Sequence, residues 1–90
     1  MSSASDTPTG LLYVVRDESS SDWYPLVTQH DVIVLTENGV YRNRNQLPQC
    51  RQVYALANDC TARAVEPWAA VIDHDTWVSL SLECQQVVRI

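Results

Sequence analysis

Four short runs of apolar, mostly β-branched residues constrain the fold more than any other feature of this sequence. Continuous runs of this kind, unlike runs that alternate with polar residues, are typical of strands covered on both faces. The runs begin 21, 21 and 16 residues apart, and a parallel crossover with its helix needs about 10 to 12 residues or more. The spacing therefore allows a compact series of βαβ units with short helices. The four runs are Leu11–Val15, Val32–Leu35, Val53–Ala57 and Ala69–Ile72.

The segments between the runs predict short helices. Pro25 tolerates only a first-turn position, so a helix within Ser19–Gln29 is either brief or begins late. Asn58 or Asp59 can cap a further helix that runs through Val65, because a short side-chain acceptor satisfies amides of the first turn.

The segment from Thr76 to Cys84 fits two structures. Its apolar residues alternate as in a strand, yet a subset also shares one face of a helix. Asp73 or Asp75 can cap a helix running to about Cys84, directly after a buried strand, and this favours the helix. Val87–Ile90 is expected to add a short terminal strand.

The length of 90 residues predicts a single domain. Residues 1–10 are rich in Ser, Thr, Pro and Gly and are expected to form a flexible tail, so the α/β domain would span residues 11–90.

The longest unbroken apolar run has five residues, far fewer than the roughly 20 that a membrane-spanning helix needs. Without a basic, apolar leader the start does not resemble a secretory signal, so we expect a cytoplasmic protein with no membrane association.

The charge and the cysteine content of the chain limit the classes of partner and ligand that we expect it to bind. Eleven acidic residues against six arginines, with no lysine, give a net charge of −5. A negatively charged phosphate backbone repels such a chain, so we expect no direct nucleic-acid binding.

Cys50, Cys60 and Cys84 form no Cys-x-x-Cys pair, which favours reduced thiols and no zinc site. The sequence Asp73-His74-Asp75 comes closest to a metal or acid–base cluster, but a helix cap beside a surface histidine is the favoured interpretation. We expect no metal and no cofactor.

The order of several segments then indicates a family. The first expected strand is followed by a second strand and by a turn that has an acidic residue before Gly-Val-Tyr. The third strand ends in Tyr-Ala-Leu and precedes a helix that contains Ala-Arg. The last strand is followed by an acidic turn and then by an aromatic residue. These segments are Leu11–Val15, Asp31–Tyr41, Val53–Leu56 with Asp59 and Ala62–Ala64, and Val71–Asp73 with Thr76–Val78 and Leu80. In order and spacing the chain resembles the TusB/DsrH family of small sulfur-relay subunits.

The resemblance implies a three-layer α/β/α fold with a mainly parallel sheet of four to five strands and short helices. It also implies a heterohexamer built from three related proteins. Such an assembly passes persulfide sulfur toward 2-thiouridine formation at the tRNA wobble position, or takes part in sulfur oxidation. The persulfide cysteine belongs to a DsrE/TusD-like sister subunit, and a DsrF/TusC-like subunit completes the complex. The resemblance therefore implies a non-catalytic chain that assembles and orients its persulfide-bearing partner.

Two other roles remain open. Some family members carry a cysteine in the first helix, but Ser21–Leu26 contains none and Trp23 stands near that place. A thiol carrier would use Cys60, because amide dipoles in the first turn of its predicted helix lower a thiol pKa, or less plausibly Cys50. Against this, buried cysteines such as Cys60 and Cys84 commonly serve as small apolar filler. The chain could also be a divergent stand-alone protein-binding module.

Seven residues are candidates for a partner interface. Three tryptophans and four tyrosines exceed what a small core easily hides, and aromatic residues are enriched at interfaces. The Asn-Gly turn after the second strand is expected to need a positive φ, and the arginines beyond it could bind carboxylates of a neighbour. Core packing, a structural turn and solvated arginines are the alternative interpretations. The candidates are Trp23, Tyr24, Gly39, Tyr41, Arg42, Arg44 and Trp68.

Overall fold

Five parallel strands form one sheet in the computed structural model, which describes residues 10–84 and 86–89. The strand order is β4-β3-β2-β1-β5, and all four neighbouring pairs are parallel. This confirms the predicted α/β fold, at the upper end of the expected strand number. The strands are β1 (Leu11–Val15), β2 (Val32–Leu35), β3 (Gln52–Leu56), β4 (Ala70–Ile72) and β5 (Gln86–Arg89).

The apolar runs are continuous because the central strands are covered on both faces. Every residue of β2 is buried, and so is every residue of β1 after Leu11. Tyr13 of β1 lies opposite Ile33 of β2 on one side and Val88 of β5 on the other. The first strand therefore sits inside the sheet, with the last strand beside it.

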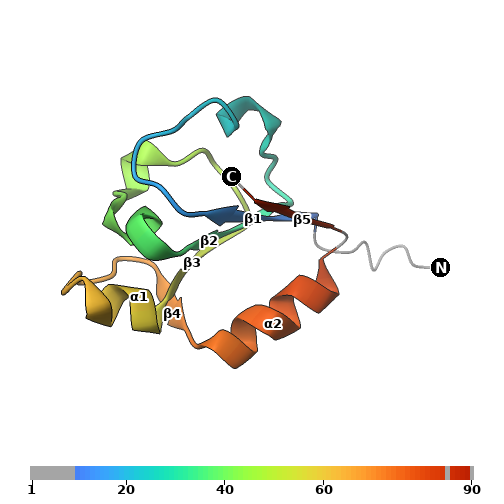
Figure 1. Cartoon of the computed structure of the whole chain (residues 1–90). Coiled ribbons are helices and arrows are strands. Elements are labelled where there is room, and N and C mark those ends of the chain that lie inside the picture. Colours follow the sequence, from blue (N-terminus) through green and yellow to red (C-terminus); the bar gives the residue numbers. More distant parts are fainter. Residues whose placement is uncertain (1–9, 85, 90) are drawn as a thin grey trace.

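Two layers cover the sheet (Figure 1). Three short 3-10 helices lie on one face: η1 (Tyr24–Leu26), η2 (Glu37–Tyr41) and η3 (Arg44–Gln46). The longest helix, α2 (His74–Glu83), lies on the opposite face. Crossover connections between parallel strands are right-handed, so two crossovers that run across the sheet in opposite directions lie on opposite faces. The β4-to-β5 connection returns across the whole sheet, which explains why α2 is separated from the 3-10 helices.

Alternate residues of the strands feed two hydrophobic clusters. One lies under the 3-10 helices and contains Tyr13, Val15, Trp23, Ile33, Leu35, Val40, Ala55 and Cys60. The other lies under α2 and contains Leu12, Val32, Val34, Leu56, Ile72 and Cys84. Because side chains alternate along a strand, successive residues of β1 enter different clusters.

Helix α1 (Ala57–Ala62) is shorter than predicted. The expected extension to Val65 is wrong because Ala64 adopts a positive φ of 53°. The amide of Val65 donates to the Cys60 carbonyl at 2.9 Å, and that of Ala64 donates to the Thr61 carbonyl at 3.2 Å. This pair of bonds is a Schellman motif, which ends a helix with one left-handed residue.

The predicted cap of α1 is also wrong. The residue at the N-cap position is Leu56, and no side chain caps the helix there. Asn58 and Asp59 both lie inside the first turn. One Asp59 carboxylate oxygen instead accepts a hydrogen bond from the amide of Glu37 at 2.9 Å, which ties α1 to η2. The segment Ser19–Gln29 forms only the single turn η1, with Pro25 in its first turn as expected.

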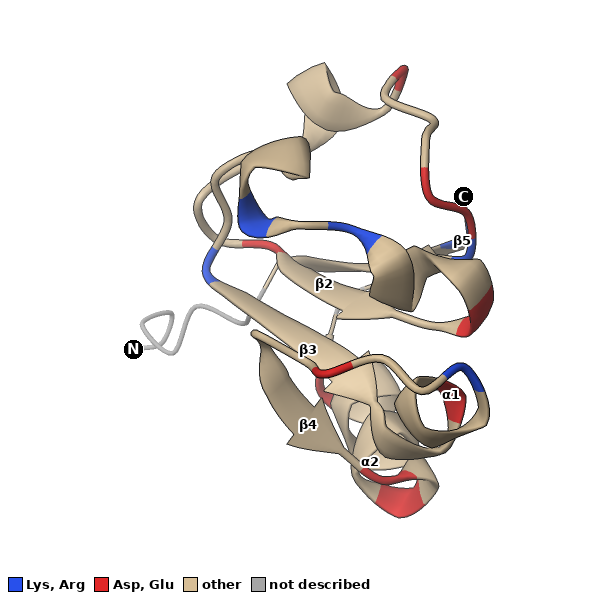
Figure 2. Cartoon of the chain, turned by 90° about the vertical axis from the view of Figure 1, so that its left-hand side faces the viewer, with Lys and Arg blue, Asp and Glu red and all other residues tan. Residues whose placement is uncertain are grey.

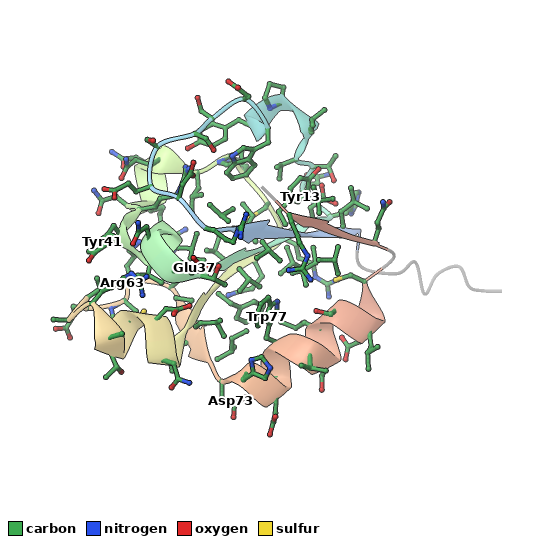
Figure 3. The ribbon with its side chains drawn as sticks, viewed as in Figure 1. Tyr13, Glu37, Tyr41, Arg63, Asp73 and Trp77 are labelled. Atoms are coloured by element: carbon green, nitrogen blue, oxygen red, sulfur yellow. The ribbon has the colours of Figure 1, made fainter. Side chains whose placement is uncertain are left out.

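The segment from Thr76 to Cys84 is helical, as favoured. Asp73 is the N-cap residue, and its carboxylate accepts a hydrogen bond from the Thr76 amide at 2.8 Å. Figure 3 shows Trp77 pointing from α2 toward the sheet, where it packs against the cluster under this helix. A capping residue directly after a strand therefore outweighed the strand-like alternation.

Parts of the predicted ends lie outside the described residues. This applies to the expected tail except for Gly10, whose amide donates to the His30 carbonyl at 2.9 Å. It applies also to Ile90 in the expected terminal strand, whose observed part begins at Gln86.

Candidate functional site

The side chain of Arg42, a predicted interface residue, is instead buried on the 3-10 face, with 1% of its surface exposed. Its Nε donates to the Asp17 carbonyl at 2.9 Å, and its Nη2 donates to the Ser20 carbonyl at 2.7 Å. Its Nη1 donates to the Gln46 carbonyl at 3.1 Å and to the Tyr24 hydroxyl at 2.7 Å. The planar guanidinium thus fastens η1, η3 and the loop after β1 to one another. Arg42 is a structural hub and offers no surface to a partner.

The aromatic residues beside Arg42 complete this hub. Its guanidinium carbon lies 5.5 Å from the ring centre of Trp23 and 5.9 Å from that of Tyr24, within the range of cation–π attraction. Trp23 also stacks on Tyr13 at 5.9 Å and is only 5% exposed. The prediction of Trp23 as an interface residue is therefore corrected, because the chain's own core covers the ring. Tyr24 remains partly exposed.

Asp17 supplies the countercharge at the rim of the hub. One of its carboxylate oxygens accepts from Nη2 of Arg42 at 2.8 Å, while its side chain is 52% exposed. Partial desolvation raises the pKa of Asp17, but hydrogen bonds from Arg42 and Ser20 outweigh it and hold the pKa below its usual value. The ion pair therefore joins a buried cation to a carboxylate that water still reaches.

Gly39 is buried and does not have the positive φ expected of it. In the turn after β2 the positive φ, 49°, belongs to Glu37. A Cβ on Gly39 would lie 2.3 Å from the Val15 carbonyl oxygen, so glycine is needed for close approach of η2 to the end of β1. Gly39 is thus a packing residue that presents no side chain to a partner.

Tyr41 keeps the exposure that an interface residue needs, with 45% of its surface accessible. Figure 3 shows Tyr41 at the same end of the molecule as Glu37 and Arg63. Nearby, Nε of Arg63 donates to Oδ1 of Asn38 at 3.0 Å, which links α1 to η2. The role of Tyr41 at an interface stays a prediction.

Arg44 and Trp68 meet on the 3-10 face although they are far apart in the sequence. The guanidinium carbon of Arg44 lies 4.9 Å above the Trp68 ring, and the indole Nε1 donates to the Arg42 carbonyl at 2.6 Å. Both residues line a groove of about 630 Å³ over the amino ends of β3 and β4. Other lining residues include Leu47, Pro48, Cys50, Arg51, Val53 and Ala70. The structure therefore unites two interface candidates with a hollow that the sequence did not predict.

The three cysteines form no disulfide with one another, and the pKa of each thiol is raised. Burial, and in second place the charge of Asp59, raises the pKa of Cys60, so the expected activation in the first turn of a helix is wrong. Burial likewise raises the pKa of Cys84 and that of Cys50. Cys60 and Cys84 are buried in the two clusters, as filler residues should be, whereas Cys50 is only partly buried and lines the groove.

Within the described ranges, His, Cys, Asp and Glu side chains form no group of three or more that could hold a metal ion. His74 packs its ring edge-on against Trp77 at 5.6 Å and is exposed, as a surface histidine beside a cap would be. None of the helices in this part of the chain is long and apolar enough to cross a bilayer.

A family model described as DsrH like protein matches residues 15–87, from the end of β1 to β5. The chain belongs to the DsrH-like family. This confirms the resemblance indicated by the order of segments. A search of curated proteins found no match. DsrH-like proteins are sulfur-relay subunits and work as parts of multi-subunit complexes.

Sequence reasoning about this DsrH-like chain missed both the hub and the groove. The acceptors of Arg42 are main-chain carbonyls, which carry no signal in the side-chain sequence. The groove depends on the approach of residues 44–53 to residues 68–70, across the β3–α1 unit. The sequence does carry one weak signal of an ordered loop after Arg42. Asn43, the next residue, forms a capping box with Gln46 three residues later.

Proposed function

We propose that this chain is a non-catalytic subunit of a cytoplasmic sulfur-relay complex. Its role is to assemble and orient a DsrE/TusD-like partner that carries the persulfide, with a DsrF/TusC-like subunit completing a heterohexamer. The sulfur would pass toward 2-thiolation of the tRNA wobble uridine or would come from sulfur oxidation. Membership of the DsrH-like family is the observation that carries this proposal.

The state of the thiols supports a non-catalytic role. Persulfide transfer begins with attack by a thiolate, so a relay cysteine needs a low pKa and access to the partner. All three thiols have a raised pKa, and two of them are buried. Sulfur chemistry therefore falls to the partner, while this chain supplies a binding surface.

The partly exposed aromatic and arginine residues suit such a surface. Four of the candidate residues remain accessible to solvent: Tyr24, Tyr41, Arg44 and Trp68. The hub around Arg42 holds Tyr24 and Trp68 in place, and Trp68 in turn contacts Arg44. Rigid aromatic and arginine side chains dominate binding energy at many interfaces. Pre-ordered side chains also lose less conformational entropy on association.

Co-expression with the DsrE/TusD-like and DsrF/TusC-like proteins of the same genome tests the proposal. We expect one complex in size-exclusion chromatography with light scattering, and after sulfur loading we expect persulfide on the partner's cysteine only, by mass spectrometry. A variant with Cys50→Ser, Cys60→Ala and Cys84→Ala, in which the buried thiols become apolar side chains, should support transfer at the unmodified rate. Separate elution of the subunits would refute the role.

One specific observation favours a second candidate, a thiol carrier that uses Cys50. Cys50 is the thiol that lines the groove, whereas Cys60, the stronger candidate by sequence, is buried. Persulfide found on Cys50, with transfer abolished by Cys50→Ser and unchanged by Cys60→Ser, would establish this role. Its raised pKa argues against it. A folded monomer that binds no sister subunit would instead indicate a stand-alone binding module.

A further inference from the structure

We propose that the groove over the amino ends of β3 and β4 binds an extended, acidic segment of a partner subunit, held by Arg44. This inference rests on the proposed function, because it assumes that the chain works inside a complex. It adds the place on this chain where the partner binds and the chemistry of the segment that fits.

The size of the groove suits a bound segment. At about 630 Å³ it lies within the range of sites that hold small ligands and peptide side chains. Its floor is firm, because Leu47, Val53 and Trp68 pack against the cluster under the 3-10 helices. It runs onto β4, which lies at the end of the sheet and leaves Val71 46% exposed. An extended chain can therefore enter alongside this edge.

The charge of the groove selects an acidic occupant. Among the residues that the structure describes, Arg44 and Arg51 line it, and no aspartate or glutamate does. The carboxylate of Asp31, whose charge acts on the groove's Cys50, is buried and accepts hydrogen bonds from the amides of Leu11 and Thr28. Figure 2 shows basic positions in the connection leading into β3 and acidic positions on α2, which lies on the opposite face of the sheet. Although the chain has a net charge of −5, this recess is lined by arginines.

Arg44 is oriented to receive a carboxylate. The guanidinium carbon lies 4.9 Å from the centre of the Trp68 ring, which restrains the side chain, and the Trp68 indole is itself anchored by the Arg42 carbonyl. Among the described residues, no hydrogen bond or ion pair engages the guanidinium of Arg44, in contrast to the fully engaged one of Arg42. A stacked arginine keeps its edge donors available, and these match a carboxylate in a bidentate pair.

Zero-length crosslinking tests the proposal in the reconstituted complex with both sister subunits. The chain contains no lysine, so Arg44→Lys introduces its only side-chain amine, which a carbodiimide joins to a carboxylate in direct contact. We expect a crosslink from position 44 to an aspartate or glutamate of a partner subunit. Arg16→Lys, at an exposed position outside the groove, is the matched control and should give no such crosslink.

Alkylation of Cys50 gives an independent measure of groove occupancy. N-ethylmaleimide should label Cys50 in the isolated chain about tenfold or more faster than in the complex, because the bound segment covers the thiol. Arg44→Glu should weaken assembly about tenfold or more, whereas Arg16→Glu should not. Substituting the crosslinked partner carboxylate by arginine should restore assembly with Arg44→Glu.

The outcomes separate the two proposals. An intact complex in which Cys50 reacts at the isolated-chain rate and position 44 gives no crosslink would overturn the groove while leaving the subunit role standing. Failure of the complex to form would overturn the subunit role, and the groove proposal with it. A crosslink to a second copy of this chain, or protection of Cys50 by added tRNA but not by the sister subunits, would also overturn it.

Discussion

Nη1 of Arg42 donates a 2.7 Å hydrogen bond to the Tyr24 hydroxyl, which in turn donates to the Gln46 carbonyl. The phenol is therefore a relay between a buried cation and a main-chain oxygen. Because the two donors act in sequence, each bond polarises the next. The buried guanidinium of Arg42 therefore fixes the position of the partly exposed Tyr24.

Arg42→Met should lower the free energy of unfolding by about 3 kcal/mol, because three carbonyl oxygens lose a charged donor with which they form part-buried hydrogen bonds. Urea unfolding followed by tryptophan fluorescence measures this loss. Asp17→Asn is the control, and we expect a loss below about 1 kcal/mol because water screens the half-exposed carboxylate. Equal losses from the two variants would show that the ion pair, rather than the carbonyl bonds, holds the hub.

Gly39→Ala should lower the free energy of unfolding by about 1–3 kcal/mol, since the new methyl group meets the Val15 carbonyl oxygen and η2 has to move away from β1. The midpoint of thermal unfolding measures the change. Asn38→Ala, one residue earlier and exposed, should cost less than about 1 kcal/mol despite its bond to Arg63. A Gly39→Ala variant as stable as the parent would contradict the close approach.

Ala64→Gly should stabilise the chain by about 0.5–1 kcal/mol. Ala64 has a φ of 53°, and a left-handed conformation costs a residue with a Cβ roughly 1–2 kcal/mol, part of which the greater chain entropy of glycine offsets. Ala62→Gly, in the last turn of α1, should have the opposite sign by about 1 kcal/mol. Urea midpoints of both variants check the prediction, and destabilisation by Ala64→Gly would refute the Schellman ending.

The N-cap of α2 should make stability depend on pH. Hydrogen bonds from the side chain and the amide of Thr76 hold the pKa of Asp73 below its usual value. A depressed pKa contributes stability that is present above the unfolded-state pKa of about 3.9 and is lost as pH falls through the folded-state value.

Asp73→Asn keeps a capping oxygen but cannot titrate, so the stability difference between parent and variant should be constant above about pH 5 and should shrink below about pH 4. Urea midpoints between pH 7 and pH 2.5 measure this difference. Asp73→Ala, which removes the cap, should unfold earlier than the parent at neutral pH. A parent-to-Asn difference that does not change with pH would contradict the role of the charge.

The strands and α2 were predictable because their signals are local. Val32–Leu35 is apolar throughout, so a buried strand was the natural interpretation of it alone. Asp73 marked the start of α2 because its own side chain makes the cap. Family membership followed from the order of such segments, and it needed no single diagnostic motif.

The hub and the groove were not predictable because they depend on distant parts of the chain. An arginine in a polar loop usually lies in solvent, and the burial of Arg42 requires acceptors 25 residues before it in the sequence. Trp23 was placed at the surface because the sequence cannot show that Tyr13 and Arg42 enclose it. The early end of α1 depends on the positive φ of Ala64, which alanine does not signal.

The pairing of β5 with β1 has a consequence for biosynthesis. Until Gln86–Arg89 has left the ribosome, the nascent chain carries the first strand as an open edge, with a row of unpaired amides and carbonyls beside an apolar sequence. Such an edge can pair with other chains, and a sheet closed by its last strand forms through contacts distant in sequence, which slows folding. Completion of this sheet thus depends on Gln86–Arg89, and a chain that lacks these residues would be prone to aggregate.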